Sequence, residues 1–253
     1  MSLDQVDILG VGITSAPAAD VLDDIDRRVP YGHALFIAFA NANTLNLASQ
    51  SAYYRAVLNR ADLILNDGVG VAMAARMKNR RFPENLNGTD FTPRLLDLAA
   101  ARGWNVYLLG GAEGTASEAA ENLCRQTPNL RVAGTHHGYL TSESTDEVVA
   151  SIRAAQADVV VVAMGNPTQE YWLAANLDAT GARIGIGVGA FLDFAAGRVA
   201  RAPGFLRRAR LEWLWRLAIE PRRLWRRYVV GNPLFLYRAA RYSRRMRYQG
   251  GAV

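Results

Sequence analysis

The stretch ADVVVVAMG (157–165) decides the fold class, because an uninterrupted apolar run ends directly in a glycine. A run without alternation of polar and apolar side chains is typical of a strand buried on both faces of its sheet. Such strands occur in parallel sheets that helices cover on both sides. The stretch therefore predicts an α/β protein.

Six further apolar runs have the same character. They are DILGVGI (7–13), ALFIAFA (34–40), ADLILND (61–67), NVYLLGG (105–111), LRVAGTH (130–136) and ARIGIGVG (182–189). Segments with helical spacing lie between them, and Asp90, Ser142 and Thr168 are residue types that begin helices. The repeated strand-then-helix order predicts a doubly wound, mostly parallel sheet.

Charge divides the chain into an acidic body and a basic tail. Residues 1–197 contain 14 basic and 21 acidic side chains, whereas residues 198–253 contain 15 arginines, no lysine and two glutamates. Three of the five tryptophans also lie in that tail. We therefore predict a core over 1–197 and a C-terminal Arg/Trp-rich helical appendage over 198–253. Such a cationic segment implies a polyanionic partner.

Composition argues against several classes of protein. Cys124 is the only cysteine, so we expect no disulfides and a reducing, cytoplasmic compartment. One cysteine and three histidines argue against the usual zinc sites, and we expect neither a metal nor a cofactor. The start MSLDQVDILG lacks a basic segment, which argues against a secretory signal. No apolar run approaches the roughly 18 residues that span a bilayer.

The ends of the predicted strands carry the candidate site, because open α/β sheets bind ligands beyond the carboxyl ends of their strands. Small and polar residues recur there, and we expect them to bind substrate: Asn41, Asn43, Gly110, Gly111, Tyr139, Gly187 and Gly189. Small residues let the backbone approach a phosphate, and carboxamides orient a polar ligand.

The residues alone allow two interpretations of several motifs. Asp67 could be a general base at the mouth of the site, or it could cap a helix that opens at Gly68. Gly110-Gly111 could cradle a phosphate or form a tight turn, because it lacks the full G-x-G-x-x-G fingerprint. Asp24-Ile25-Asp26 has the D-x-D form that holds a metal, but it fits a solvated helix face better.

The tail repeats arginines among aromatic residues. EWLWRLAIEPRRLWRRY (212–228) places Arg216, Arg223 and Arg226 among tryptophans and leucines. Aromatic anchors with arginines suit an anionic membrane surface, where each basic residue contributes about 1 kcal/mol. The alternatives are a helical cap with a solvated arginine face, or a nucleic-acid-binding segment.

Eight stretches carry a resemblance to a known family. They are NANTLNLA (41–48), ADLILNDGVGV (61–71), NGTDF (87–91), VYLLGG (106–111), GTHHGYL (134–140), VVAMGNPTQEYW (161–172), GVGAFLDFAAGRVARAP (187–203) and LEWLWRLAIEPRRLWRRY (211–228). Over nearly its whole length the chain resembles the WecG/TagA/CpsF glycosyltransferases, glycosyltransferase family 26.

The resemblance implies an inverting, metal-independent glycosyltransferase with a Rossmann-like fold. Such enzymes transfer a sugar from a UDP-sugar donor to a sugar linked to undecaprenyl (polyprenyl) diphosphate, an early step in making cell-wall polymers and exopolysaccharide. It also implies a peripheral protein on the inner face of the bacterial plasma membrane. The appendage would bind to the surface of that membrane.

The resemblance also implies roles for individual residues. Asp67 corresponds to the general base of the family, and Asn43 and Gln169 correspond to residues that contact the substrate. Asp193 corresponds to an acidic residue on the uridine side of the site. Arg216, Arg223 and Arg226 fall on arginines of the appendage that complete the catalytic site. Without a metal, arginines would neutralise the departing UDP, because they match phosphate geometry bidentately.

The sequence also departs from the family pattern. Asn41 stands where many members carry Thr, and Asn85 and Asn87 stand where Arg and Thr are common. These positions lie near the expected sugar site. The departures leave the identity of the donor sugar open.

Two other functions stay open on the residues alone. An NAD-linked Rossmann oxidoreductase is opposed by the poor dinucleotide fingerprint. An arginine-tail nucleic-acid-binding protein would leave the polar strand ends of the acidic body unexplained. We favour the glycosyltransferase and expect no nucleic acid among its partners. Whether the protein forms a homo-oligomer is also left open.

Overall fold

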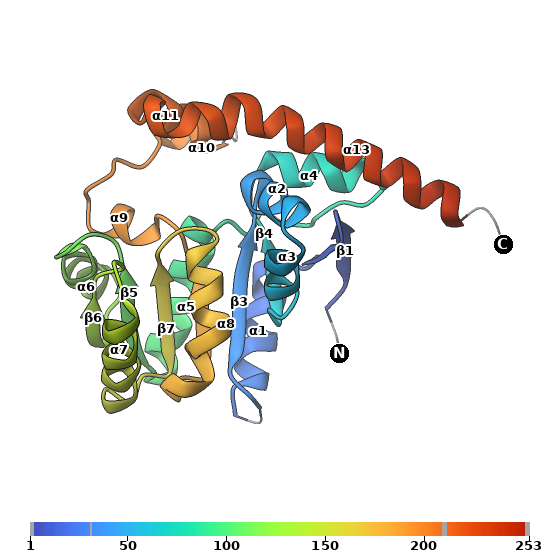
Figure 1. The fold of residues 1–253 in the computed structure, drawn as a ribbon. Helices are drawn as coiled ribbons and strands as arrows, with labels where there is room; N and C mark the ends of the chain where they lie inside the picture. The colour runs from blue at the N-terminus through green and yellow to red at the C-terminus, as the bar shows by residue number, and fades with distance from the viewer. Residues whose placement is uncertain (1–2, 31, 209–211, 251–253) are drawn as a thin grey trace.

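The computed structural model describes residues 3–30, 32–208 and 212–250 (Figure 1). The described strands form one sheet in the order β1-β2-β4-β3-β8-β7-β5-β6. They are β1 Gln5–Ile8, β2 Val11–Thr14, β3 Leu35–Ala40, β4 Leu63–Asn66, β5 Asn105–Gly110, β6 Arg131–His136, β7 Val159–Ala163 and β8 Ile184–Gly187. Apart from the antiparallel β1–β2 pair, neighbouring strands are parallel. The predicted α/β, mostly parallel, Rossmann-like fold is confirmed.

Helices connect most of the strands and continue to the C-terminus. Those of the body are α1 Ala18–Arg28, α2 Ala42–Gln50, α3 Ala52–Leu58, α4 Val69–Arg76, α5 Gly88–Arg102, α6 Thr115–Gln126, α7 Ser142–Ala154, α8 Thr168–Thr180 and α9 Phe191–Ala195. The C-terminal ones are α10 Gly204–Arg208, α11 Glu212–Ile219, α12 Pro221–Trp225, the π-helix η1 Arg226–Val230 and α13 Gly231–Gly250.

Local capping decides where several helices begin. α7 and α8 begin at Ser142 and Thr168, as predicted, and the Thr141 side chain caps α7, whereas α8 has no side-chain cap. α5 begins before Asp90, at Gly88, because the Asn87 side chain accepts a hydrogen bond from the Asp90 N–H and caps the helix. Asn87, and not Asp90, is therefore the N-cap of α5.

Alternate residues of each central strand enter two separate hydrophobic cores. In β7, Val159 and Val161 belong to one core, and Val160 and Val162 belong to the other. The first core lies under α1, α5 and α6, and the second lies under α2, α3, α7 and α8. The valine run lacks alternation because helices cover both faces of the sheet.

Two strand predictions need correction. The segment 7–13 forms a hairpin rather than one strand, because Ile8 pairs with Val11 and leaves Leu9-Gly10 as a two-residue loop. Both loop residues have positive φ, 57° and 78°, as a type I′ turn requires. The strand over 130–136 is β6, which lies at the sheet edge and is partly exposed rather than buried.

The C-terminal helices lie across the carboxyl end of the sheet (Figure 1). Phe235 and Ala239 of α13 are buried in the second core, against α2 and α4. Asn46 of α2 donates to the Gly231 carbonyl at 2.8 Å and accepts from Arg238 at 2.9 Å. Within the described ranges, no helix is long and apolar enough to cross a membrane. The division into units at residue 197 stays a prediction.

The strand order creates a place for a ligand. The chain passes from β3 to β4 on one side, and later returns through β7 to β8, which pairs with β3 on the other side. The direction of winding therefore reverses between β3 and β8. Loops diverge at such a reversal and leave a crevice beyond the carboxyl ends of the strands.

Gly110→Ala should lower the free energy of unfolding by more than about 2 kcal/mol, measured by urea denaturation. Gly110 has a φ of +147°, and a Cβ would lie 2.4 Å from the Ala163 carbonyl oxygen. The matched control is Gly181→Ala, where φ is +75° but a Cβ meets nothing within 4 Å. Gly181→Ala should lower the free energy of unfolding by only about 1 kcal/mol. Equal losses would contradict the packing explanation.

Candidate functional site

A cleft of about 990 Å³ lies between the carboxyl ends of the strands and the C-terminal helices. Most of the predicted site residues line it: Asn41, Asn43, Asp67, Gly111, Tyr139, Gln169, Gly187, Gly189, Asp193 and Arg216. They come from the ends of six strands, β3 to β8, or from the segments that follow these strands, and from α11. The fold thus brings residues far apart in the sequence into one cavity.

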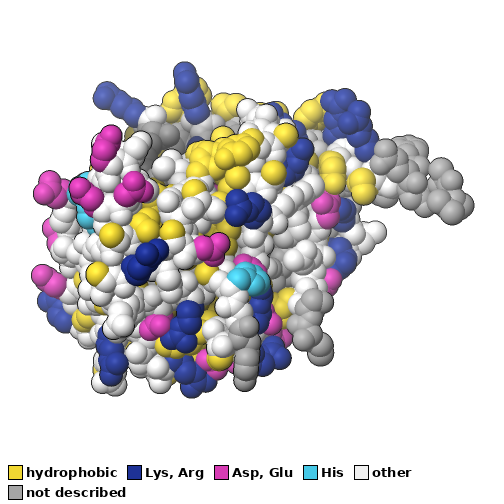
Figure 2. All heavy atoms as spheres, turned by 60° about the horizontal axis from the view of Figure 1, so that its bottom comes forward, with side chains coloured by type: hydrophobic (Ala, Val, Ile, Leu, Met, Phe, Trp, Pro, Cys, Tyr) yellow, Lys and Arg dark blue, Asp and Glu magenta, His cyan; other side chains and the backbone are white. Residues whose placement is uncertain are grey.

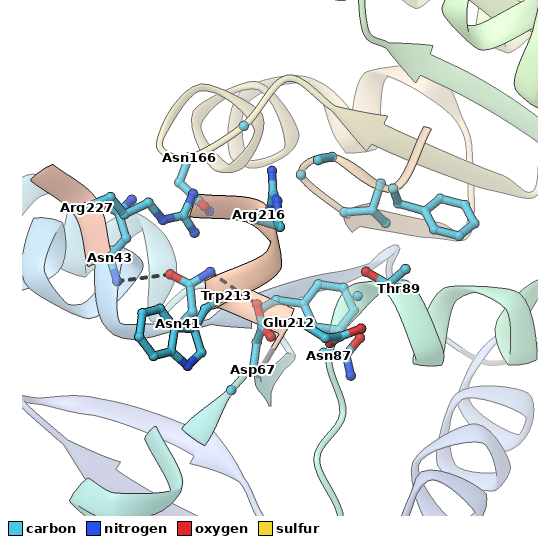
Figure 3. Close-up of a pocket in the computed structure, with 18 of the residues that line it drawn as sticks. Asn41, Asn43, Asp67, Asn87, Thr89, Asn166, Glu212, Trp213, Arg216 and Arg227 are labelled. Atoms are coloured by element: carbon cyan, nitrogen blue, oxygen red, sulfur yellow. Dashed lines mark hydrogen bonds between the residues drawn. The ribbon is translucent and has the colours of Figure 1, made fainter. Parts of the chain in front are cut away.

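Asp67 directly follows β4 and accepts a hydrogen bond from Asn41 Nδ2 at 3.2 Å (Figure 3). Burial raises the pKa of the Asp67 carboxyl, and so does the charge of Asp90. The hydrogen bond from Asn41 and the charges of Arg227 and Arg216 act in the opposite direction. A carboxylate with a raised pKa can accept a proton closer to neutral pH. The alternative that Asp67 caps α4 is wrong, because α4 has no side-chain cap.

Helix α2 fixes the orientation of the Asn41 amide. Asn41 Oδ1 caps α2 by accepting from the N–H groups of Asn43 at 3.0 Å and Thr44 at 3.1 Å. The Nδ2 group is therefore the one that faces Asp67. Asn41, predicted to bind substrate, thus also holds the carboxylate in position.

The side-chain amide of Gln169, which the sequence predicts to contact substrate, makes its hydrogen bonds to groups of the protein itself. Gln169 is only 2% exposed. Its Oε1 accepts from the N–H groups of Gly165 at 3.1 Å and Gly189 at 2.9 Å, and its Nε2 donates to Glu170 at 2.7 Å. Gln169 therefore ties the loop after β7 to the loop after β8, and both loops line the cleft.

A buried polar network around Glu170 supports that wall of the cleft. Glu170 accepts hydrogen bonds from the Tyr54 hydroxyl at 3.0 Å and from Asn166 Nδ2 at 2.6 Å. Burial raises the pKa of both Glu170 and Tyr54. The network fixes the side chain of Asn166, which lines the cleft.

Of the two predicted phosphate or metal motifs, only the Gly110-Gly111 motif reaches the cleft, through Gly111. Gly110 ends β5 and pairs with Ala163 of β7, whereas Gly111 lines the cleft. A phosphate cradle at Gly110-Gly111 stays a prediction. Asp24 and Asp26 lie on α1 and pair with arginines of α1 and α5. In the part of the chain that the structure describes, no group of three His, Cys, Asp or Glu residues could hold a metal. Metal independence stays a prediction.

The predicted arginines of the tail occupy different places. Arg216 enters the cleft, and its Nε is buried without a hydrogen-bond partner among the described residues. Arg226 is exposed and lies over the Trp225 ring, 5.5 Å from its centroid, outside the cleft lining. The side chain of Arg223 lies outside the described part of the chain. Arg227 lines the cleft where Arg226 was expected.

Sequence reasoning did not select several residues that line the cleft. They are Thr89, Asp90, Asn166, Arg201, Trp213, Arg227 and Tyr228. Arg227 belongs to the same arginine run as Arg226, and no local pattern indicated which of the two faces the cleft. Asn85 accepts a hydrogen bond from the Gly68 N–H at 2.8 Å, beside Asp67.

Comparison with known proteins gives consistent matches along the chain. The profile described as "Glycosyl transferase WecG/TagA/CpsF family" matches residues 6–249. The N-acetylglucosaminyldiphosphoundecaprenol N-acetyl-beta-D-mannosaminyltransferase of Bacillus spizizenii is 34% identical over 209 residues, which cover 83% of this chain and 80% of the relative. The protein of the same name from Staphylococcus aureus strain MRSA252 is 29% identical over 245 residues, which cover 96% and 95%.

Asp67→Asn should raise the melting temperature at pH 8, and the gain should vanish near pH 4, where an unfolded Asp takes up its proton. The folded pKa of Asp67 lies above the unfolded one, so ionisation costs folding free energy as the pH rises. Thermal denaturation of both proteins between pH 4 and pH 8 measures the difference. A variant less stable than wild type at pH 8 would contradict this account of Asp67.

Proposed function

The chain belongs to the WecG/TagA/CpsF family of glycosyltransferases, and we propose that it transfers a sugar from a UDP-sugar donor to a sugar on polyprenyl diphosphate. The relatives from Bacillus and Staphylococcus carry N-acetylglucosaminyldiphosphoundecaprenol in their names. We extend that acceptor class to this enzyme. The observation that supports the proposal best is the oriented Asp67 carboxylate in a cleft that Arg201, Arg216 and Arg227 also line.

In the proposed reaction, Asp67 removes the proton from the acceptor hydroxyl. Asn41 holds the carboxylate through a hydrogen bond whose direction α2 fixes. The hydroxyl oxygen attacks the anomeric carbon of the donor as the bond from that carbon to the diphosphate breaks. Attack from the face opposite the diphosphate inverts the configuration of the anomeric carbon.

The departing UDP gains negative charge, which a cation must stabilise. Arg216 is suited to this task because it enters the cleft from α11 beside α9, which carries Asp193. Asp193 lines the same cleft, and we propose that it contacts the uridine. With arginine supplying the charge, the transfer needs no metal ion.

The donor sugar is not assigned by these residues. Asn85 binds the Gly68 N–H, and Asn87 caps α5, so both departures from the family pattern also shape the wall beside Asp67. Both relatives are named for transfer of N-acetyl-β-D-mannosamine. UDP-N-acetylmannosamine, its uronic acid and UDP-glucose are therefore the donors to compare.

We further propose that the C-terminal helices meet the inner face of the plasma membrane, where the acceptor resides. Exposed apolar side chains gather on them: Leu214, Ile219, Trp225, Val229, Val230, Leu234 and Tyr237. Figure 2 shows Lys and Arg side chains interspersed with hydrophobic ones along the upper edge of the molecule. Apolar area together with cationic charge binds anionic bilayers peripherally.

Asp67→Asn should lower kcat/KM roughly 100- to 10,000-fold in a transfer assay with polyprenyl-diphosphate-linked N-acetylglucosamine, because the amide cannot accept the proton. Wild-type activity should rise with pH through an apparent pKa above about 4, since burial raises the pKa of Asp67 and only the carboxylate is a base. Activity should persist in EDTA.

Asp178→Asn is the control for that assay, because Asp178 is exposed near the end of α8 and outside the cleft lining. It should retain wild-type turnover. An Asp67→Asn enzyme with more than about a tenth of wild-type kcat/KM would refute the general-base role.

Trp225→Ala combined with Val230→Ala should weaken binding to phosphatidylglycerol vesicles several-fold, measured by co-sedimentation. These side chains are 45% and 51% exposed, and vesicle binding would bury their apolar area. Tyr53→Ala is the control, since Tyr53 is 71% exposed on α3 of the body. If the Tyr53 variant lost as much binding as the double variant, the membrane face would be assigned wrongly.

A further inference from the structure

Backbone N–H groups fix the orientation of the Gln169 amide. The N–H groups of Gly165 and Gly189 can only donate, and both reach one atom of the Gln169 side chain, at 3.1 Å and 2.9 Å. That atom is therefore the carbonyl oxygen Oε1. The other amide atom, Nε2, must then donate, and it lies 2.7 Å from Glu170 Oε1. The amide has room because residue 187 is glycine, where a Cβ would lie 2.9 Å from Nε2.

The same Glu170 oxygen fixes the orientation of the Asn166 amide. Glu170 Oε1, which accepts from Gln169, also accepts from Asn166 Nδ2 at 2.6 Å. The Tyr54 hydroxyl donates to the other carboxyl oxygen, Oε2, at 3.0 Å. Glu170 is fully buried and is absent from the lining of the cleft. Its carboxyl group therefore holds the Asn166 amino group from behind the wall.

This arrangement leaves the Asn166 carbonyl oxygen for the cleft. Asn166 lines the cleft, and no group among the described residues donates a hydrogen bond to its Oδ1. The two ends of a planar amide point apart, so an Nδ2 group turned toward the buried Glu170 leaves Oδ1 directed away from it. Figure 3 shows the Asn166 side chain extending from the loop before α8 toward Asn43 and Arg227, which also line the cleft. The free oxygen is suited to accept a hydrogen bond from a ligand.

An oxygen acceptor restricts which group of a ligand it can bind. At neutral pH a diphosphate that links two substituents carries no proton, so it cannot donate to Asn166. Sugar hydroxyls, an acetamido N–H and the uracil N–H can donate. Asn166 therefore suits the uncharged, hydrogen-bonding parts of the substrates, whereas arginines suit their diphosphates.

We propose that Asn166 Oδ1 accepts a hydrogen bond from a hydroxyl or N–H group of a bound substrate, and that Glu170 is the positioning residue that turns this amide toward the cleft. The inference rests on the proposed function and extends its site. Asn166 contacts the substrate, whereas Glu170 acts only through Asn166. A substrate group that loses this acceptor inside the cleft is left without a partner, so the loss of affinity is measurable.

The test measures dissociation constants by isothermal titration calorimetry for UDP, for farnesyl-diphosphate-linked N-acetylglucosamine, and for the tightest-binding of UDP-N-acetylmannosamine, its uronic acid and UDP-glucose. Asn166→Ala should weaken a ligand that carries the donating group roughly 5- to 100-fold. A loss for UDP and the UDP-sugar places that group on the uridine, and a loss for the UDP-sugar alone places it on the donor sugar. A loss for the farnesyl ligand alone places it on the acceptor sugar. Pyrophosphate should bind Asn166→Ala and wild type equally.

A double-mutant cycle tests the role of Glu170. Glu170→Met removes the acceptor of the Asn166 amino group, so the same ligand should lose affinity. In the Asn166→Ala background, Glu170→Met should cause no further loss, because the amide through which it acts is gone. Glu170→Gln should keep wild-type affinity, because its oxygen can accept from both amides while its amino group donates to the Tyr54 hydroxyl.

Asn176→Ala is the matched control. Asn176 lies on α8 outside the cleft lining and donates to the Trp172 carbonyl at 2.9 Å. It should bind every ligand as wild type does. Circular dichroism checks the folding of each variant, and if Glu170→Met does not fold, Glu170→Asp replaces it in the cycle, because the shorter side chain withdraws the acceptor from Asn166.

Three results would overturn the inference: unchanged affinity of Asn166→Ala for all these ligands, equal losses for all of them including pyrophosphate, or additive losses in the cycle. The titrations decide the matter even if no donor gives product. A wild-type protein that binds the ligands but transfers no sugar would count against the proposed function alone, and one that binds none of them would overturn both.

Discussion

Burial of the central strands on both faces is the constraint on which the rest of this structure depends. β3, β4, β7 and β8 are buried along their whole lengths, so helices must cover each side of the sheet. Burying a polar group within these strands costs free energy unless it finds a partner, so polar side chains gather where the strands end. Because parallel strands end at one edge, that edge collects Asn41, Asp67 and Asn166 around a common cleft.

Local hydrogen bonds then fix the orientations of the side chains around the cleft. Asn41 caps α2 and for that reason presents its amino group to Asp67. Gln169 joins two loops through their backbone N–H groups, and Glu170 holds Asn166 from behind. These hydrogen bonds fix the side chains that shape the cleft, which is how a carboxylate can be held in a defined position.

The C-terminal helices add positive charge to a cleft whose lining from the body is acidic. α13 is anchored through Phe235 in the core and through Asn46 of α2, and Arg216 and Arg227 on the preceding α11 and η1 line the cleft. The same helices carry the exposed apolar side chains of the proposed membrane face. The same C-terminal segment thus lines the cleft and carries the surface proposed to contact the membrane.

The sequence by itself determined the α/β class, the strands after which the site residues follow, and the family, because buried runs and strand-end residues are local patterns. It also located Asp67, since a carboxylate after a buried strand must lie at the sheet edge. Only the tertiary structure decided that Asn41 orients Asp67, that the Gln169 amide is used internally, and that Arg227 rather than Arg226 enters the cleft. The direction of a side chain depends on caps, helix register and contacts between segments far apart in the chain, and no local pattern contains them.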